Sequence, residues 1–123
     1  MQCQLRSADR ILFEGHASMV VTRSPRGEFA IMDGHAPLLA VLDAGPIRIH
    51  ADGDTRVFAS RGGTLRTVGD RVSLLVESAV PVEEIDLSDV QARLSRLADR
   101  DDAADVEERE YLDLLRTVKE AHG

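Results

Sequence analysis

The sequence predicts two structural parts, an N-terminal antiparallel β-sandwich over residues 1–84 and a C-terminal α-helical hairpin over residues 85–123. Three observations support this prediction. Apolar and polar residues alternate in the first part, which is the period of a half-buried strand. Two-residue turns rich in Gly and Asp separate several of these segments. From Ile85 onward apolar residues recur every three or four positions, which is the period of a helix.

The strand predictions follow the alternation along the chain. Clear alternating segments are Cys3–Leu5, Ile47–Ile49 and Val72–Val76. Asp52-Gly53 and Gly69-Asp70 lie between such segments and predict hairpins with turns of the primed types. Many short strands at this spacing favour a sandwich or a flattened barrel.

The first helix is expected to begin just after Ile85. Its apolar stripe consists of Leu87, Val90, Leu94 and Leu97. Ser88 followed by Gln91 forms a capping-box pair, and Asp86 is an alternative N-cap.

A polar run, Asp99-Arg100-Asp101-Asp102, interrupts the stripe and predicts a turn. We expect a second helix from near Asp105, with Tyr111, Leu115 and Val118 on one face and Leu112 and Leu114 beside it. The pattern of residues 85–123 therefore predicts a helical hairpin.

Composition excludes several classes of protein. With 43% hydrophobic and 30% charged residues, the chain is typical of a soluble globular protein. No apolar stretch is long enough to span a membrane, and the N-terminus lacks the pattern of a signal peptide, so we expect a cytosolic protein. A net charge of −7 disfavours a nucleic-acid partner. The single cysteine, Cys3, is expected to be a small buried hydrophobe in the first strand.

Signatures of enzymes and of metal sites are missing. The sequence lacks a Gly-x-x-x-x-Gly-Lys phosphate loop, a Gly-x-Ser-x-Gly elbow and a His-Glu-x-x-His pair. The four histidines are scattered, and an acidic series from Asp99 to Glu110 fits a calcium loop poorly, because Ala103 and Ala104 stand where a ligand and a glycine are needed. We therefore expect no catalytic residue, no metal and no cofactor.

The most distinctive segment is the run from Gly27 to Leu39. Gly27 and Gly34 can supply positive backbone torsions, and Pro37 biases Ala36 toward an extended conformation, so the run reads as a strand, an exposed loop and another strand. With Gly45-Pro46-Ile47-Arg48-Ile49 and Gly62-Gly63-Thr64-Leu65 in the same order and spacing, it resembles the epsilon subunit of the F-type ATP synthase, of the bacterial type with a short C-terminal domain.

This resemblance implies a non-catalytic rotor subunit of the central stalk. The β-sandwich would dock on the gamma subunit and the c-ring, and catalysis would stay on the beta subunits. In the family the tail can touch the alpha and beta subunits and can restrain ATP hydrolysis. The resemblance also implies a peripheral protein at the cytoplasmic face of the bacterial plasma membrane.

The resemblance points to three candidate residues for the interface with the c-ring or gamma, namely Glu28, Asp33 and His35. The corresponding loops of the family face the polar loops of the c-ring, where a carboxylate or an imidazole can form hydrogen bonds. The alternative is that these are surface residues that merely cap turns.

The tail departs from the family at a nucleotide-binding motif. Some bacterial relatives bind ATP through Ile or Leu, Asp, two variable residues, Arg and Ala. Here Ile85 and Asp86 match this motif, but Asp89 stands in place of the arginine. We therefore expect no nucleotide binding, and we interpret Asp86 as an N-cap.

Two other functions remain open on the residues alone. A free-standing β-sandwich that binds a small ligand or glycan would need an aromatic pocket, for which four aromatic residues are poor material. A small hydrolase that uses the carboxylates between Asp99 and Asp105 would need a rigid scaffold for them, and a charged turn is a poor one.

Overall fold

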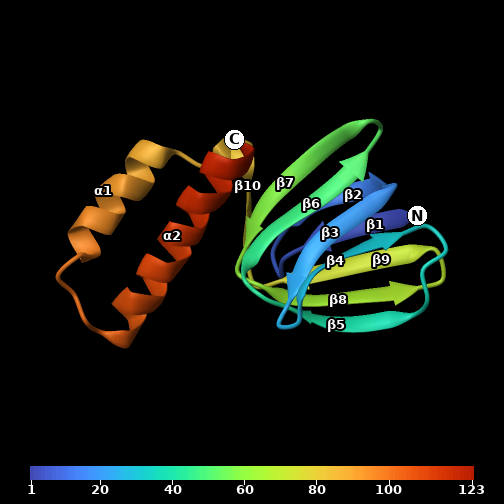
Figure 1. Cartoon of the computed structure of the whole chain (residues 1–123), viewed down its shortest axis with the longest axis horizontal. Coiled ribbons are helices and arrows are strands. Elements are labelled where there is room, and N and C mark those ends of the chain that lie inside the picture. The colour runs from blue at the N-terminus through green and yellow to red at the C-terminus, as the bar shows by residue number, and fades with distance from the viewer. The chain divides into compact units, whose positions relative to one another are not determined.

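The computed structural model describes all 123 residues, and these divide into two compact units, Met1–Pro81 and Val82–Gly123. The first is built from strands and the second from helices, so the predicted sandwich and helical hairpin are confirmed (Figure 1). The second unit opens with a short 3-10 turn, η1 (Val82–Glu84), which lies just before the change of period at Ile85.

The strands of the first unit form two five-stranded sheets. The first sheet has the order β2-β1-β9-β8-β5 and the second has the order β10-β7-β6-β3-β4. The strands of the first sheet are β1 (Gln2–Arg6), β2 (Ile11–His16), β5 (Leu38–Leu42), β8 (Gly63–Val68) and β9 (Arg71–Val76). Those of the second are β3 (Met19–Ser24), β4 (Gly27–Met32), β6 (Gly45–Ala51), β7 (Asp54–Ser60) and β10 (Ala79–Pro81).

Both predicted two-residue hairpins are confirmed. Ala51 pairs with Asp54 across the first turn, where Asp52 and Gly53 have φ values of 54° and 78°, as a type I′ turn requires. Val68 pairs with Arg71 across the second, where Gly69 has a φ of 58°. One pairing departs from the antiparallel expectation, because β1 and β9 run parallel. They are distant in sequence, so no tight turn forces them to run in opposite directions.

The core lies between the two sheets and comes from the inward side of each strand. Its largest fully buried side chains include Phe58, Leu5, Ile47, Ile49, Leu65 and Leu74. Cys3 is also completely buried, and this burial raises the pKa of its thiol to about 12. At neutral pH Cys3 is therefore an uncharged core residue, as the sequence predicts.

Gly63 shows why the Gly62-Gly63 pair is needed where β8 begins. A Cβ atom at Gly63 would collide with the backbone carbonyl of Leu75 in β9. Because that obstacle is backbone, a side-chain rotation cannot relieve it. Only glycine allows β8 and β9 to approach this closely.

The second unit contains α1 (Leu87–Leu97) and α2 (Ala103–His122), which pack against each other. Asp86 is the N-cap of α1, and its side chain accepts hydrogen bonds from the backbone N–H groups of Ser88 at 2.9 Å and Asp89 at 3.3 Å. Asp86 is thus the cap, and the capping box beginning at Ser88 is wrong. Asp86 caps the helix in place of Ser88 because its carboxylate accepts hydrogen bonds from two N–H groups of the first turn.

The second helix begins at Ala103, two residues before Asp105. Its buried side chains are Leu112, Leu115 and Val118, whereas Tyr111 is half-buried, so the apolar face lies slightly to one side of the expected one. Arg109 of α2 donates hydrogen bonds to the carbonyl oxygens of Leu97, at 2.7 Å, and Arg100. The Leu97 carbonyl also accepts the backbone N–H of Arg100 at 3.1 Å, so the Arg109 bonds attach α2 to the turn that follows α1.

Candidate functional site at the edges of β4 and β5

The loop that joins β4 to β5 carries two of the three predicted interface residues. It runs from Asp33 to Pro37 between the edge strands of the two sheets. Gly34 has a φ of 80°, and a Cβ there would meet nothing within 4 Å, so its requirement for glycine is torsional rather than steric. The predicted strand, loop and strand are therefore all present.

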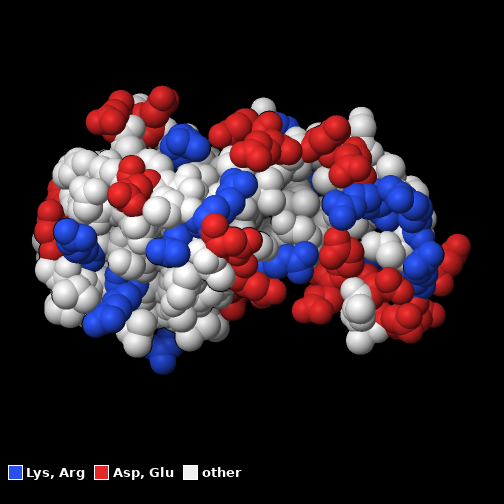
Figure 2. All heavy atoms as spheres, turned by 180° about the vertical axis from the view of Figure 1, so that it is seen from behind, with Lys and Arg blue, Asp and Glu red and all other residues white.

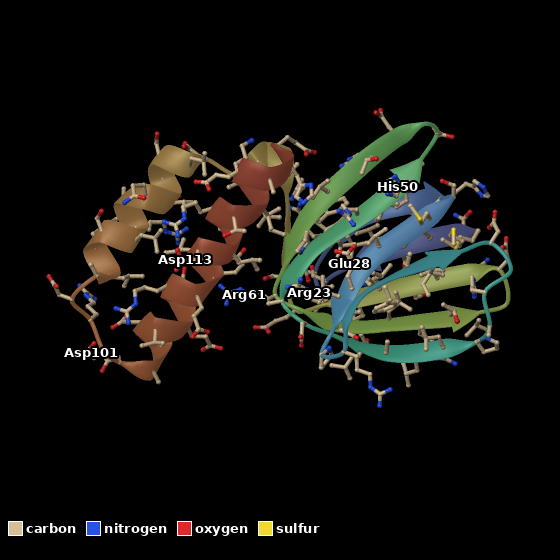
Figure 3. All side chains as sticks on the ribbon, viewed as in Figure 1. Arg23, Glu28, His50, Arg61, Asp101 and Asp113 are labelled. Carbon is tan, nitrogen blue, oxygen red and sulfur yellow. The ribbon has the colours of Figure 1, made fainter.

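Glu28 lies in β4 on the exposed side of the second sheet. It faces Arg23 of β3 in register (Figure 3). Its Oε1 atom lies 3.0 Å from Nη2 of Arg48 in β6. The ion pair therefore joins residues separated by one intervening strand. Because Arg48 compensates its charge, the Glu28 carboxylate is already oriented before any partner arrives.

Asp33 begins the loop and is bound by the amino group of Met1. The ammonium nitrogen of Met1 lies 2.7 Å from Oδ1 of Asp33 and also donates to the carbonyl of Ala17 at 3.1 Å. The hydrogen bond from this ammonium group, together with its positive charge, lowers the pKa of the Asp33 carboxyl below its ordinary value of 3.8. The structure thus gives Asp33 a role in holding the loop, whatever else it contacts.

His35 lies near the middle of the loop with a half-buried ring. Its Nδ1 atom is 3.4 Å from the carbonyl oxygen of Ala36, a long contact within the same turn. No carboxylate is paired with the ring, so the imidazole is held less firmly than Glu28 or Asp33. The three candidates lie along one strand and the following loop but do not converge on a common point.

Thr67 of β8, which was not among the residues predicted from the sequence, holds this loop. The Thr67 side chain is buried, accepts a hydrogen bond from the N–H of Leu38 at 2.7 Å and donates one to the carbonyl of Ala36 at 3.2 Å. One hydroxyl therefore satisfies two backbone groups on either side of Pro37. Thr67 lies inward in an alternating strand, and a polar residue at such a position is the signal that could have revealed it.

A groove opens beside the predicted site. Its volume is about 550 Å³, and it is lined by the turn and first residues of the β3–β4 hairpin, Ser24 to Phe29, and by Leu38 to Val41 of β5. Leu39 is 73% exposed and Val41 is 64% exposed. The run from Leu38 to Leu42 is apolar without alternation, which is the sequence signal of a strand with two apolar faces.

The charge of the molecule is unevenly divided. Residues 1–81 carry nine basic and nine acidic residues, whereas residues 82–123 carry six basic and thirteen acidic residues. On the face shown in Figure 2, uncharged areas separate the charged side chains of the sandwich, while charges are crowded on the helical unit. Apolar contact is therefore more available on the sandwich.

Two further properties of the structure concern metal binding and membrane insertion. No group of three or more His, Cys, Asp or Glu side chains is arranged to hold a metal ion. No helix is both long enough and apolar enough to cross a bilayer.

Comparison with known proteins identifies the family. Residues 1–82 match the family model of the ATP synthase delta/epsilon chain, beta-sandwich domain. The chain belongs to this family. Its members are non-catalytic subunits of ATP synthase, so the expectation of a non-catalytic chain is confirmed.

Relatives named ATP synthase epsilon chain extend the match beyond the sandwich. The protein of Streptomyces avermitilis is 38% identical over 104 residues, which are 84% of each chain. That of Brevibacillus brevis is 35% identical over 101 residues, which are 81% of this chain and 76% of the relative. The predicted resemblance to the epsilon subunit is therefore confirmed.

Solved structures share the fold of this epsilon-family chain at lower identity. A chain in the Euglena gracilis mitochondrial ATP synthase structure, described as OSCP/F1/c-ring, aligns with a TM-score of 0.79 at 20% identity, covering 98% of this chain and 80% of that one. A chain in the Tetrahymena thermophila structure of the central stalk and c-ring aligns with a TM-score of 0.64 at 14% identity, covering 96% and 95%.

Proposed function

We propose that this chain is a central-stalk rotor subunit that joins the gamma subunit to the c-ring of an F-type ATP synthase and thereby couples proton flow to ATP synthesis. The observation that carries this proposal is the 38% identity to an ATP synthase epsilon chain over 84% of both chains. The aligned structures are parts of assemblies whose descriptions name a c-ring and a central stalk. The chain would then be peripheral, held at the cytoplasmic face of the plasma membrane by the complex.

Docking on gamma is supported by the apolar surface of the sandwich. Seven large apolar side chains are exposed on it: Ile11, Met32, Leu38, Leu39, Val41, Val68 and Leu75. Val41 and Leu75 both pair with Thr64 in register, so they lie together on the outer face of the first sheet. Apolar residues grouped on an exposed face are typical of an interaction surface.

We assign contact with the c-ring to the polar residues of β4 and of the loop that follows it. Glu28, Asp33 and His35 lie on β4 and the loop after it. Since Arg48 and the Met1 ammonium group already bind the two carboxylates, His35 is the candidate whose hydrogen-bonding capacity is least used. We expect His35 to contact the partner directly and the two acids to keep β4 and the loop in place.

The helical unit is proposed to be a regulatory tail that does not bind ATP. Asp89 replaces the arginine of the nucleotide motif, and its Oδ2 atom lies 3.8 Å from Nη1 of Arg93. The Asp86 side chain is engaged as the N-cap of α1. Negative charge at Asp89 would repel a triphosphate. A micromolar affinity for Mg-ATP, measured by titration calorimetry, would contradict this part of the proposal.

Co-expression with the gamma subunit of the same synthase tests the central assignment. We expect the two chains to elute together in size-exclusion chromatography and the isolated chain to have no ATPase activity. A chain that stays separate from gamma would overturn the assignment and favour the free-standing binding module.

A further inference from the structure

Two methionines and a histidine form a row across three strands of the second sheet. Met19 of β3 pairs in register with Met32 of β4 on one side and with His50 of β6 on the other. His50 lies near the end of β6 (Figure 3). The neighbours of these three residues along their own strands are core residues, namely Val20, Ile31 and Ile49. Because side chains alternate between the two faces of a strand, the two thioethers and the imidazole share the outer face of the sheet.

The row is close-set and open to solvent. Side chains of directly paired residues have Cβ atoms about 4.5–5.5 Å apart, and Met19 is directly paired with both of the others. Methionine is unbranched and flexible, so its sulfur can adapt its position to a neighbour. Met32 is 57% exposed, and Met19 and His50 are half-buried. An ion above Met19 is therefore within reach of all three side chains and can enter without any strand moving.

Thr55 of β7 continues the row and orients the histidine ring. It pairs with His50 in register, and its Oγ1 atom lies 3.0 Å from Nδ1 of His50. A histidine that binds a metal through one ring nitrogen usually donates the N–H of the other to an oxygen, which fixes the tautomer and the direction of the ring. The Thr55 hydroxyl is placed for this role at Nδ1, and Nε2 is then the nitrogen available to an ion.

The donor atoms determine which class of ion this row suits. Two thioether sulfurs and one imidazole nitrogen include no carboxylate and no thiolate. Calcium and magnesium prefer oxygen ligands, and zinc is bound by Cys, His, Asp or Glu. Thioether and imidazole together suit copper(I). Asp33, the residue after Met32, does not change this donor set, because its carboxylate is bound by the Met1 ammonium group at 2.7 Å.

We propose that Met19, Met32 and His50 form a binding site for one soft monovalent cation, copper(I), with Thr55 holding the imidazole in place. Thioether sulfurs are not among the His, Cys, Asp and Glu groups considered above, so the site is compatible with the absence of such a cluster. It would overturn the expectation from the sequence that the chain holds no metal. The site is independent of the proposed rotor function, because all its ligands come from this chain.

Nuclear magnetic resonance of the full chain, labelled with ¹³C at the methionine methyl groups, tests the ligand set. Silver(I) replaces copper(I) in the titration because it has the same soft character and is not oxidised by air. The chain has three methionines, and Met1 is buried in the core. We expect the Met19 and Met32 signals to shift together and saturate at one equivalent, while the Met1 signal stays in place. Shifts of only one of the two signals, or of neither, overturn the proposal.

Variants of single ligands test the same site with copper(I) itself. Competition with a chromophoric chelator, under reducing and anaerobic conditions, measures the affinity. Met19→Leu, which conserves volume, and Thr55→Val should each weaken binding by about tenfold or more, the loss typical when the support of a metal ligand is removed. His35→Gln, a histidine outside the row, is the control and should leave the affinity unchanged.

Two outcomes of this competition would assign copper(I) elsewhere. Loss of binding in Cys3→Ala with full binding in Met19→Leu would place the ion at the buried thiol and overturn the proposal. Zinc(II) bound as tightly as copper(I) would show that the thioethers do not contribute, and would overturn it as well. Circular dichroism of each variant shows that the chain is folded when its affinity is measured.

Discussion

Thr67 illustrates how one buried side chain positions the candidate site. Its hydroxyl joins the backbone on both sides of Pro37, at Ala36 and Leu38, although 31 and 29 residues separate these positions from it in sequence. The loop that carries His35 is therefore held by the first sheet. Without this hydroxyl, the N–H of Leu38 and the carbonyl of Ala36 would lose a protein partner at the edge of the core.

Thr67→Val is therefore expected to destabilise the protein by about 1–3 kcal/mol, because it keeps the shape of the side chain but removes two hydrogen bonds from partly buried groups. Urea unfolding followed by circular dichroism measures this. Thr64→Val, in the same strand but on the exposed face, is the matched control and should change the free energy of unfolding by no more than about 0.5 kcal/mol. Equal effects at the two positions would show that Thr67 does not hold the loop.

Asp33 makes stability depend on pH in a known direction. Its pKa in the folded state is lowered by the hydrogen bond and the charge of the Met1 ammonium group, so the unfolded chain binds a proton more readily. The stabilisation is fully present above the ordinary pKa of 3.8 and is lost as the pH falls through the lower folded value.

The difference in the free energy of unfolding between wild type and Asp33→Asn should consequently shrink as the pH is lowered below about 4. Chemical unfolding at a series of pH values measures this difference. Asp54→Asn, at another exposed carboxylate for which no cation partner is found, is the control. A difference in the free energy of unfolding that is independent of pH would mean that the contact between Asp33 and the Met1 ammonium group does not stabilise the folded chain.

At the scale of elements, the start of α1 depends on the residue that caps it. Asp86→Ala is expected to destabilise the helical unit by about 0.5–2 kcal/mol, since two N–H groups of the first turn lose their acceptor. Ser88→Ala should have a much smaller effect, because the Asp86 side chain and not that of Ser88 provides the cap. Helical circular dichroism during thermal unfolding distinguishes the two variants, and a larger loss for Ser88→Ala would reinstate the capping box.

The polar residues of the β4–β5 region should affect coupling more than stability. The double variant Glu28→Ala and His35→Ala is expected to weaken proton-coupled ATP synthesis while the fold persists, because exposed ion pairs contribute only about 0–1 kcal/mol. Membrane vesicles that carry the variant provide the measurement, with Glu14→Ala of β2 as the control. Unchanged proton pumping would leave both residues as ordinary surface groups.

At the scale of the whole molecule, the charge of the tail sets what it can do. The basic side chains of α2 are already engaged within the unit: Arg109 with the carbonyl of Leu97, Arg116 with Asp113 at 2.6 Å and Lys119 with the carbonyl of Val82 at 3.2 Å. The same helix carries six acidic residues. An acidic partner would therefore be repelled, although salt screens the repulsion beyond about 8 Å.

Deletion of residues 86–123 from the assembled synthase is accordingly expected to change the rate of ATP hydrolysis little. Full-length and truncated complexes, prepared at equal subunit stoichiometry, allow a direct comparison of the rates. A several-fold rise after deletion would show that the tail inhibits hydrolysis despite its negative charge.

The sequence by itself determined the features that depend on near neighbours. Alternation placed β1, β6 and β9, Asp52-Gly53 and Gly69-Asp70 placed the hairpins, and the helical period placed both helices, because these patterns reflect torsions and hydrogen bonds within a few residues. The competition between Asp86 and Ser88 was also visible locally. Its outcome depended on which side chain reached the free N–H groups.

Only the tertiary structure decided which groups meet around the site. The pairing of Glu28 with Arg48 spans 20 residues, that of Asp33 with the amino group of Met1 spans 32, and the Thr67 contact with Leu38 spans 29. The groove appears because edge strands of two different sheets come together, which depends on sheet order and on no local pattern. Local preferences specify elements, whereas packing of the two sheets determines which of their side chains and edges remain available to a partner.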